Sequence, residues 1–231
     1  MQSPIYSQGH GEPSHPHIRT FHARGGRMSA KREFALKQYL PHLEISQLER
    51  PIDLCHVLAR DEIVIDLGSG MGDHTTQLAA DNTHLGVLAI DVHTVGLCEL
   101  SEFVAINKLE NVRTHHGDGL DVLNGWLLPE SISEVHILFP DPWPKARHHK
   151  RRLLQPNVVE KIIQVLRPGG VLRFVTDDAN YYEHAMEILC ANQSLIQDAS
   201  AWDVPLTTYH RRALRLGNVI NSISFRKLAS S

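Results

Sequence analysis

The fold class of this chain is indicated most clearly by one segment, Glu62-Ile-Val-Ile-Asp-Leu-Gly-Ser-Gly-Met-Gly-Asp73. Its first six residues read as a short buried strand, and Gly68, Gly70 and Gly72 follow as a loop. Glycine permits a tight turn and lets backbone N–H groups approach a ligand closely. A helix is expected over 73–80, because the Asp73 carboxylate suits the positive end of a helix dipole.

The alternation of apolar strands with amphipathic helices continues along the chain. Strands are predicted at 62–67, 85–92, 112–116, 134–139 and 171–176, and helices from Ser29 and at 73–80, 95–107, 157–166 and 181–191. Pro168-Gly169-Gly170 is expected to end the helix before the fifth strand. This pattern predicts an α/β fold with a doubly wound, mostly parallel sheet. Right-handed crossovers would bring one set of carboxylates to a single edge of that sheet, namely Asp66, Asp91, Asp118, Asp141 and Asp177.

Length and composition suggest one domain with an extension. The 231 residues suit a single α/β domain at 19–231, preceded by a flexible arm at 1–18 that is rich in Gly, Pro, Ser and His. No apolar run is long enough to span a membrane, and the N-terminus does not resemble a signal peptide. The three cysteines are far apart and the 16 histidines are scattered, so we expect a cytoplasmic protein without a metal site.

The charge is mildly negative overall, but the cations are grouped. The formal net charge is −3, which by itself does not indicate a nucleic-acid partner. Basic residues nevertheless form three groups: Arg19, Arg24, Arg27, Lys31 and Arg32; Lys145, Arg147, Lys150, Arg151 and Arg152; and Arg211, Arg212 and Arg215. If these groups converge in space, they predict a local surface that binds anions.

The block Phe139-Pro-Asp-Pro-Trp-Pro-Lys145 follows the fourth predicted strand. Its three prolines are expected to hold the backbone extended and to present Asp141 rigidly at the end of the strand. Trp143 offers two interpretations: it stacks on a nucleobase, or it packs beneath the loop. Together with the cations that follow, the block indicates a pocket for a planar nitrogenous ring whose phosphates are bound outside.

The glycine loop points to a particular cofactor class. A dinucleotide fingerprint would have glycine at position 73, but Asp73 puts a carboxylate near the expected pyrophosphate, which disfavours NAD and FAD. S-adenosylmethionine has no phosphate and carries an ammonium group and ribose hydroxyls. Asp66 could accept from the ammonium, Asp91 from the ribose hydroxyls and Asp118 from the adenine amino group.

These motifs resemble those of the bacterial tRNA (guanine-N7)-methyltransferase family over nearly the whole chain past Ile18. The matching pieces are 18–27, 68–72, 90–93, 139–148, 150–152, 176–177 and 215–217, of which the Phe-Pro-Asp-Pro-Trp block is the most specific. The resemblance implies a Rossmann-like class I methyltransferase fold of seven strands, with a C-terminal strand near 219–226 that runs antiparallel. It also implies methylation of a variable-loop guanosine in tRNA.

The resemblance also implies roles for individual residues. The cofactor set is Asp66, Gly68, Gly70, Gly72, Asp91, Asp118 and Asp141, and the substrate set is Lys145, Asp177 and the segment from Thr207 to His210. The basic run itself adds Arg147, Lys150, Arg151 and Arg152 to the substrate set, as residues expected to bind phosphates. Many family members have Glu at positions 66 and 91, and the family typically has Thr-x-Phe-Glu where this chain has Thr207-Thr-Tyr-His210. Asp177 could instead cap a helix, and His210 could be an ordinary loop histidine.

The expected chemistry follows from guanine itself. N7 carries a free lone pair, so catalysis can rest on orientation and needs no base. Asp141 and Asp177 are the predicted catalytic residues, because a carboxylate beside the ring would stabilise the positive charge that develops on it. Two alternatives remain: a methyltransferase of the same fold acting on another base or amine, and a catalytically weak RNA-binding relative.

Overall fold

A computed structural model describes Thr20 and residues 28–229. The predicted arm at 1–18 lies outside the described residues, as do Arg19, Arg24 and Arg27 of the first basic group.

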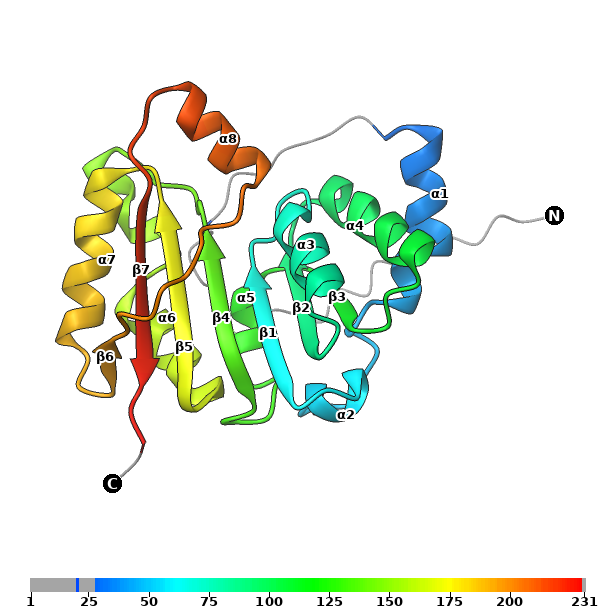
Figure 1. Cartoon of the computed structure of the whole chain (residues 1–231), viewed down its shortest axis with the longest axis horizontal. Helices are drawn as coiled ribbons and strands as arrows, with labels where there is room; N and C mark the ends of the chain where they lie inside the picture. Colours follow the sequence, from blue (N-terminus) through cyan, green and yellow to red (C-terminus); the bar gives the residue numbers. More distant parts are fainter. Residues whose placement is uncertain (1–19, 21–27, 230–231) are drawn as a thin grey trace.

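Seven strands form one sheet in the order β3-β2-β1-β4-β5-β7-β6 (Figure 1). Their bounds are β1 Glu62–Leu67, β2 Leu85–Asp91, β3 Val112–His116, β4 Ile132–Leu138, β5 Leu166–Thr176, β6 Leu195–Gln197 and β7 Asn221–Lys227. The first five are parallel, and β7 runs antiparallel to both of its neighbours. The predicted fold class is confirmed, although β6, with only three residues, had no visible pattern in the sequence.

Helices occupy the connections between the strands. They are α1 Ala30–Gln38, α2 Leu54–Leu58, α3 Asp73–Asp81, α4 Thr94–Asn107, α5 Gly119–Leu123, α6 Pro156–Val165, α7 Ala179–Ala191 and α8 Thr208–Arg215, with 3-10 turns η1 Leu40–His42 and η2 Ala146–Arg151. The five predicted helices correspond to α1, α3, α4, α6 and α7. The five-residue helices α2 and α5 and both 3-10 turns were not predicted, because such short segments show little periodicity. Helix α8 was not predicted either, although its eight residues are strongly amphipathic.

The start of β5 differs from the prediction. Pro168, Gly169 and Gly170 lie inside the strand, and Leu166 pairs with Ile132 before the register shifts. A Cβ on Gly170 would come within about 3 Å of three backbone carbonyl oxygens, among them that of Ser133. Gly170 thus allows the close backbone approach at an irregularity in the pairing of β4 and β5. The prediction that Pro168-Gly169-Gly170 ends the preceding helix is replaced by this role inside the strand.

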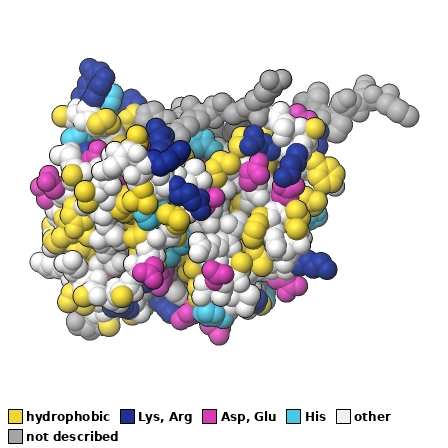
Figure 2. Space-filling view, turned by 45° about the horizontal axis from the view of Figure 1, so that its top comes forward, with side chains coloured by type: hydrophobic (Ala, Val, Ile, Leu, Met, Phe, Trp, Pro, Cys, Tyr) yellow, Lys and Arg dark blue, Asp and Glu magenta, His cyan; other side chains and the backbone are white. Residues whose placement is uncertain are grey.

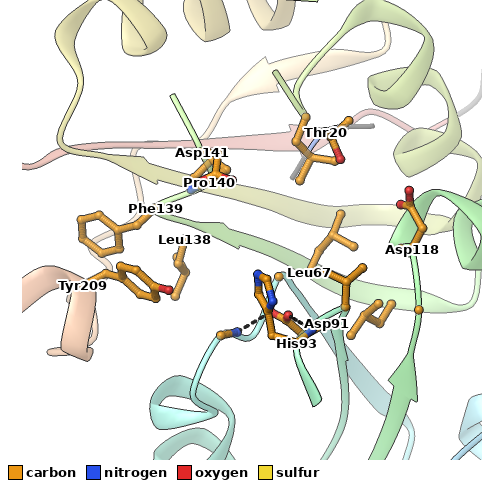
Figure 3. Close-up of a pocket in the computed structure, with 17 residues that line it drawn as sticks. Thr20, Leu67, Asp91, His93, Asp118, Leu138, Phe139, Pro140, Asp141 and Tyr209 are labelled. Atoms are coloured by element: carbon orange, nitrogen blue, oxygen red, sulfur yellow. Dashed lines mark hydrogen bonds between the residues drawn. The ribbon is translucent and has the colours of Figure 1, made fainter. Parts of the chain in front are cut away.

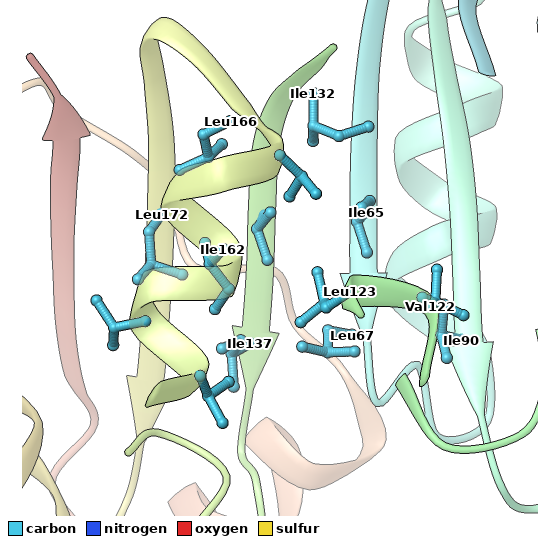
Figure 4. Close-up of a cluster of buried hydrophobic side chains, with 14 of the residues drawn as sticks. Ile65, Leu67, Ile90, Val122, Leu123, Ile132, Ile137, Ile162, Leu166 and Leu172 are labelled. Carbon is cyan, nitrogen blue, oxygen red and sulfur yellow. The ribbon is translucent and has the colours of Figure 1, made fainter. Parts of the chain in front are cut away.

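Two apolar layers sandwich the sheet. The larger cluster packs α5, α6 and α7 against one face, and its members include Ile65, Ile137 and Ile162 (Figure 4). The smaller cluster on the other face packs α3 and α4 against β2 and β3. These layers fix the five parallel strands with their carboxyl ends at one edge, and the loops at that edge form the site.

Gly96, in the first turn of α4, sets how closely α4 approaches the glycine loop. A Cβ at Gly96 would lie 1.6 Å from the carbonyl oxygen of Gly70, so no larger side chain fits without moving the helix or the loop. Gly96 could not be selected from local sequence, because its constraint comes from a loop that is 26 residues away.

We expect Gly96→Ala to lower the free energy of unfolding by about 3 kcal/mol, since overpacking forces backbone shifts. Gly125→Ala is the control: Gly125 has a left-handed backbone, with φ of 92°, which Gly96 does not have, but a Cβ at Gly125 would meet open space. For Gly125→Ala the free energy of unfolding should fall by only about 1–2 kcal/mol, the cost of a left-handed backbone for alanine. Urea unfolding of both variants measures the difference, and equal losses would contradict a close contact at Gly96.

Candidate active site

A cavity opens at the carboxyl edge of the sheet, between the glycine loop and the Asp141 block (Figure 3). It is lined by Thr20, Leu67, Gly68, Gly70, Ile90, Asp91, Val92, His93, Gly117, Asp118, Gly119, Leu138, Phe139, Pro140, Asp141, Leu153 and Tyr209. The close-up shows Phe139 and Tyr209 on one side, Asp118 on the other and Asp91 between them. Three of the five predicted carboxylates, Asp91, Asp118 and Asp141, therefore meet at one cavity.

Asp91 joins two neighbouring strand ends. Its Oδ2 accepts the Gly70 N–H at 2.7 Å and its Oδ1 accepts the His93 N–H at 2.7 Å. Burial raises the pKa of the Asp91 carboxyl above its ordinary value, whereas the two backbone hydrogen bonds lower it. A carboxylate has about four acceptor positions, so these two bonds leave capacity for ligand hydroxyls.

The glycine loop adopts the left-handed backbone that its sequence allows. Gly68, Gly70 and Gly72 have φ of 86°, 58° and 80°. The Gly68 and Ser69 N–H groups donate to the carbonyl oxygen of Ile90, which holds the loop against the end of β2. On the far side of the cavity, Asp118 caps α5 by accepting the Leu120 N–H at 3.0 Å. Both loops thus present backbone and carboxylate groups to the cavity in fixed positions.

The Asp141 block is not uniformly extended, which corrects the prediction. Phe139 and Trp143, each followed by proline, have φ of 51° and 46°. A left-handed backbone is strained for a bulky residue, and the residue before proline is further restricted. The block therefore turns sharply on both sides of Asp141, which faces the cavity. Strain of this kind persists only where surrounding contacts enforce it.

Trp143 supplies one of these contacts. Its side chain is buried, its Nε1 donates to the carbonyl oxygen of Thr20 at 2.9 Å, and the Arg151 guanidinium lies 5.0 Å from the ring centre. Trp143 consequently packs beneath the loop, and the alternative in which it stacks on a nucleobase is wrong for this arrangement.

Arg152 supplies another contact, which also corrects a prediction. It is only 1% exposed, and its Nε donates to the carbonyl oxygen of Pro142 at 3.0 Å. Its Nη2 donates to Asn180 Oδ1 at 2.8 Å, and its guanidinium lies over the Tyr181 ring. The guanidinium therefore braces the Asp141 block from inside and is not available to a phosphate.

The other cations of this group face outward. Lys145, Arg147 and Lys150 are exposed and Arg151 is half-buried, while Arg211, Arg212 and Arg215 are exposed on α8. Figure 2 shows Lys and Arg side chains on the upper part of the molecule, the end where α8 lies in Figure 1. In the first basic group, Lys31 pairs with Glu102 at 2.7 Å and Arg32 with Glu99 at 2.9 Å. These two cations dock α1 on α4, contrary to their predicted role in anion binding.

Asp66 and Asp177 lie near the cavity but not on its lining. Asp66 is 1% exposed and accepts from Thr75 Oγ1 at 2.6 Å, beside a smaller hollow that Tyr209 also lines. Asp177 Oδ2 accepts from Asn218 Nδ2 at 2.8 Å. The cap of α7 is Asp178, so the alternative reading of Asp177 as a helix cap is wrong.

Thr207 and His210 belong to the start of α8. Thr207 Oγ1 caps the helix by accepting the His210 N–H at 3.1 Å, and the His210 Nδ1–H donates to the carbonyl oxygen of Pro205 at 3.0 Å. The His210 ring lies 5.7 Å from that of Phe139. His210 is therefore a helical residue in contact with the Asp141 block, and the reading as an ordinary loop histidine is wrong.

Tyr209 was expected only as part of the 207–210 segment on the substrate side, and its position against the glycine loop was not predicted. Its ring lines the cavity, and a Cβ on Gly70 would come within 3.1 Å of its Cε2 atom. His93 and Phe139 were also missed as lining residues. The motif at 207–210 was the available signal for Tyr209, but only the fold brings it to a loop that is 139 residues away.

The chain is similar to known methyltransferases. The model of a family described as "Putative methyltransferase" matches residues 60–223. The tRNA (guanine-N(7)-)-methyltransferase of Nitrosomonas eutropha is 38% identical over 94% of this chain and 99% of that protein. The protein of the same name from Dechloromonas aromatica is 33% identical over 96% of this chain and 92% of that protein. This chain belongs to the tRNA (guanine-N7)-methyltransferase family.

Solved structures agree on the fold. The 16S rRNA methyltransferase KamB superposes with a TM-score of 0.56 at 16% identity, over 76% of this chain and 91% of that chain. The aminoglycoside resistance methyltransferase NpmB1 superposes with a TM-score of 0.56 at 21% identity, over 80% of this chain and 98% of that chain. At these identities the likeness shows the class I methyltransferase fold alone.

Two further findings concern residues 28–229. No helix in this part of the chain is long and apolar enough to cross a membrane. No cluster of three or more His, Cys, Asp or Glu side chains is arranged there to hold a metal ion.

A row of polar side chains crosses the sheet beside the site. Asp66, His136, Arg173 and Ser224 are register partners on β1, β4, β5 and β7. Glu134 joins the row because it accepts from His136 Nε2 at 2.7 Å and from Arg173 Nε at 2.6 Å. Such a buried row is stable only when each of its members has partners.

The row reaches α3 through His74, whose Nε2 lies 2.7 Å from His136 Nδ1. Burial, together with the neighbouring His136, lowers the pKa of His74 to about 4. For Glu134, burial raises the pKa, but hydrogen bonds from His136 and Arg173 outweigh it and lower the value to about 2. His74 is thus held neutral and Glu134 ionised at neutral pH.

His74 predicts a pH dependence of stability. Its pKa is 6.5 ordinarily and about 4 in the fold, so the unfolded chain binds the proton more readily. Stability is therefore complete above pH 6.5 and falls as the pH drops towards 4, by about 3 kcal/mol at most. Glu134 keeps its full stabilising contribution above its ordinary pKa of 4.5 and loses it only as the pH falls below that value. Between pH 6.5 and 4.5 the loss therefore comes from His74 and from His184, whose pKa is also lowered by burial, and a variant of His74 separates the two.

Urea unfolding at pH 7 and pH 5 tests this dependence. We expect His74→Gln to lose less stability on acidification than the parent protein does. His84→Gln, at an exposed position before β2, is the control and should keep the parent behaviour. An unchanged pH slope in His74→Gln would show that another group titrates in this window.

Proposed function

We propose that this protein transfers a methyl group from S-adenosylmethionine to N7 of a guanosine in the variable loop of tRNA. The observation that carries the proposal is the meeting of Asp91, Asp118 and Asp141 at one cavity, beside a left-handed glycine loop, in a chain of this family. A tRNA substrate also favours the cytoplasmic location that the cysteine pattern suggests.

The residues at the glycine-loop side fit S-adenosylmethionine. Gly68 leaves open space where a side chain would stand, and Asp91 keeps acceptor capacity for ribose hydroxyls. Asp118, across the cavity, can accept from an adenine amino group. When bound, S-adenosylmethionine supplies an electrophilic methyl group. Asp66, which is buried and already accepts from Thr75, would act on the ammonium from a second layer.

The Asp141 side suits a guanine ring. Guanine N7 needs no deprotonation, so the residues of this chain must orient the ring and exclude water. The Asp141 carboxylate, held between two sharp turns, can accept from the Watson–Crick N–H groups and stabilise the positive charge on the methylated ring. Asp177 follows the next strand, β5, and accepts from Asn218. It does not line the cavity, so contact with guanine at Asp177 would depend on how the tRNA approaches.

Exposed cations belong to the two elements that line the cavity on the Asp141 side and at Tyr209. Lys145, Arg147 and Lys150 follow the Asp141 block, and Arg211, Arg212 and Arg215 lie on α8, the helix that carries the lining residue Tyr209. Such cations bind RNA phosphates and position the molecule without reading its sequence. Selection of a loop guanosine would then depend on RNA shape and on a base turned out of its stack.

Labelling of bulk tRNA tests the proposal directly. The protein is incubated with S-adenosylmethionine labelled in its methyl group and with unmodified tRNA, which is then digested to nucleosides. We expect the label in 7-methylguanosine and in fragments from the variable loop. Label in another nucleoside would favour a different acceptor, and binding of tRNA without any label would favour a catalytically weak RNA-binding relative.

Asp141→Asn isolates the carboxylate charge. The amide has nearly the same size but cannot stabilise a cationic ring, so we expect kcat to fall about 100- to 1000-fold. Asp61→Asn, at an exposed position before β1, is the control and should keep full activity. Thermal unfolding verifies that both variants fold, and full activity in a folded Asp141→Asn would remove Asp141 from the mechanism.

Arg147 and Lys150 allow a test of the RNA surface. Changing both to Ala should weaken tRNA binding and reduce the slope of log K against log salt by roughly 1.5, because each released phosphate contact contributes a little under one. Lys37 and Lys108, exposed on other elements, form the control pair. Equal slopes in the two double variants would show that Arg147 and Lys150 do not contact tRNA phosphates.

A further inference from the structure

Helix α8 is only lightly packed. Ala213 is its one buried residue, and Leu214 remains 54% exposed. In Figure 1 the helix stands above the upper ends of β4 and β5, at the end of a segment that crosses the sheet from β6. A helix with so little buried surface depends on a few polar contacts at its ends.

The first of these end contacts comes from the glycine-loop side. Asp73, the first residue of α3, accepts the Thr208 N–H at 2.6 Å through its Oδ2 atom. Thr208 is the first residue of α8, and the helix has no acidic side chain of its own in the first turn. Asp73 therefore supplies, from 135 residues away, the negative charge that a helix N-terminus favours.

Asp73 completes a cap that the α8 sequence starts but does not finish. Thr207 satisfies the His210 N–H, as the threonine of a capping box does. The partner position of such a box would hold Glu or Gln, but it holds His210, which donates to Pro205 instead. Two of the otherwise unpaired N–H groups of α8 are thus satisfied, one by its own cap and one by Asp73.

The second end of α8 is tied to the substrate side. Asn218, three residues beyond the helix, donates to Asp177 at the end of β5. The helix is therefore held between a carboxylate of the glycine-loop side and a carboxylate of the guanine side. Its Tyr209 ring rests against Gly70 and lines the cavity between them.

We propose that Asp73 is a positioning residue for methyl transfer: by capping α8 from the glycine loop, it sets Tyr209 at the cofactor side of the cavity. The inference rests on the proposed function for its catalytic consequence, but not for the capping contact. Asp73 does not line the cavity at which Asp91, Asp118 and Asp141 meet, and we expect it to act through its contact with α8. Movement of the glycine loop is then transmitted to α8, which also carries the basic residues near the opening.

Hydrogen–deuterium exchange and kinetics of the full chain test the proposal. Asp73→Ala should raise amide exchange over residues 208–215 roughly three- to tenfold, since a lost cap or dipole contact has about that effect. The KM for S-adenosylmethionine should rise by a similar factor, while the KM for tRNA changes less than about twofold. Exchange in β1 and β4 should not change. Asp73→Asn, which keeps an acceptor without the charge, should lie between the parent and Asp73→Ala.

Asp81→Ala is the matched control, because it removes the same charge from the exposed end of the same helix. It should alter neither the exchange nor either KM. Unchanged exchange over 208–215 in Asp73→Ala, or an equal change in Asp81→Ala, would overturn the proposal. If Asp73→Ala does not fold, amide exchange over residues 208–215 and the KM for S-adenosylmethionine are compared between the isosteric Asp73→Asn and the parent. Unchanged values in Asp73→Asn would then overturn the proposal. A parent protein that methylates no tRNA would refute the proposed function, whereas the exchange result would still decide the role of Asp73.

Discussion

The buried carboxylate of Asp91 is the constraint on which the site depends. Its two oxygens accept backbone N–H groups from the glycine loop and from the loop after β2, so one side chain holds two strand ends together. A buried charge without partners is strongly unfavourable, so neither loop can move away without leaving Asp91 unsatisfied. The position of the loop then fixes the start of α3, the contact with Gly96 and the place where Tyr209 can rest.

The sequence could predict what depends on local pattern and on the geometry of parallel sheets. The apolar runs gave β1 to β4 nearly to the residue, and the rule that parallel strands end at one edge brought Asp91, Asp118 and Asp141 to one cavity. Asp66 and Asp177 end up beside that cavity instead. The direction of a side chain at a strand end depends on neighbouring strands and loops, such as Thr75 for Asp66 and Asn218 for Asp177, and no local pattern contains them.

The basic run shows most clearly why charge in a sequence does not determine function. Arg151 and Arg152 are adjacent and chemically identical, yet one lies over Trp143 near the surface and the other is buried beneath Pro142. Lys31 and Arg32 likewise form ion pairs with carboxylates on α4. In each case the deciding partner comes from another element, and solvent exposure is settled only when the elements pack.

The two walls of the cavity are held in different ways, and the difference has a physical cause. Under the proposed function, the Asp141 block faces guanine and the glycine loop with Tyr209 faces the cofactor. On the guanine side, the strained backbone at Phe139 and Trp143 is enforced by buried contacts, chiefly Arg152 below Pro142 and the Trp143 bond to Thr20. Prolines alone would not hold such a shape, because they restrict the backbone without selecting a left-handed residue before them. On the cofactor side, Tyr209 is carried by a helix with little buried surface. A rigid wall suits the side that must orient a ring for in-line attack, and a lightly held wall suits the side through which a consumed cofactor must leave.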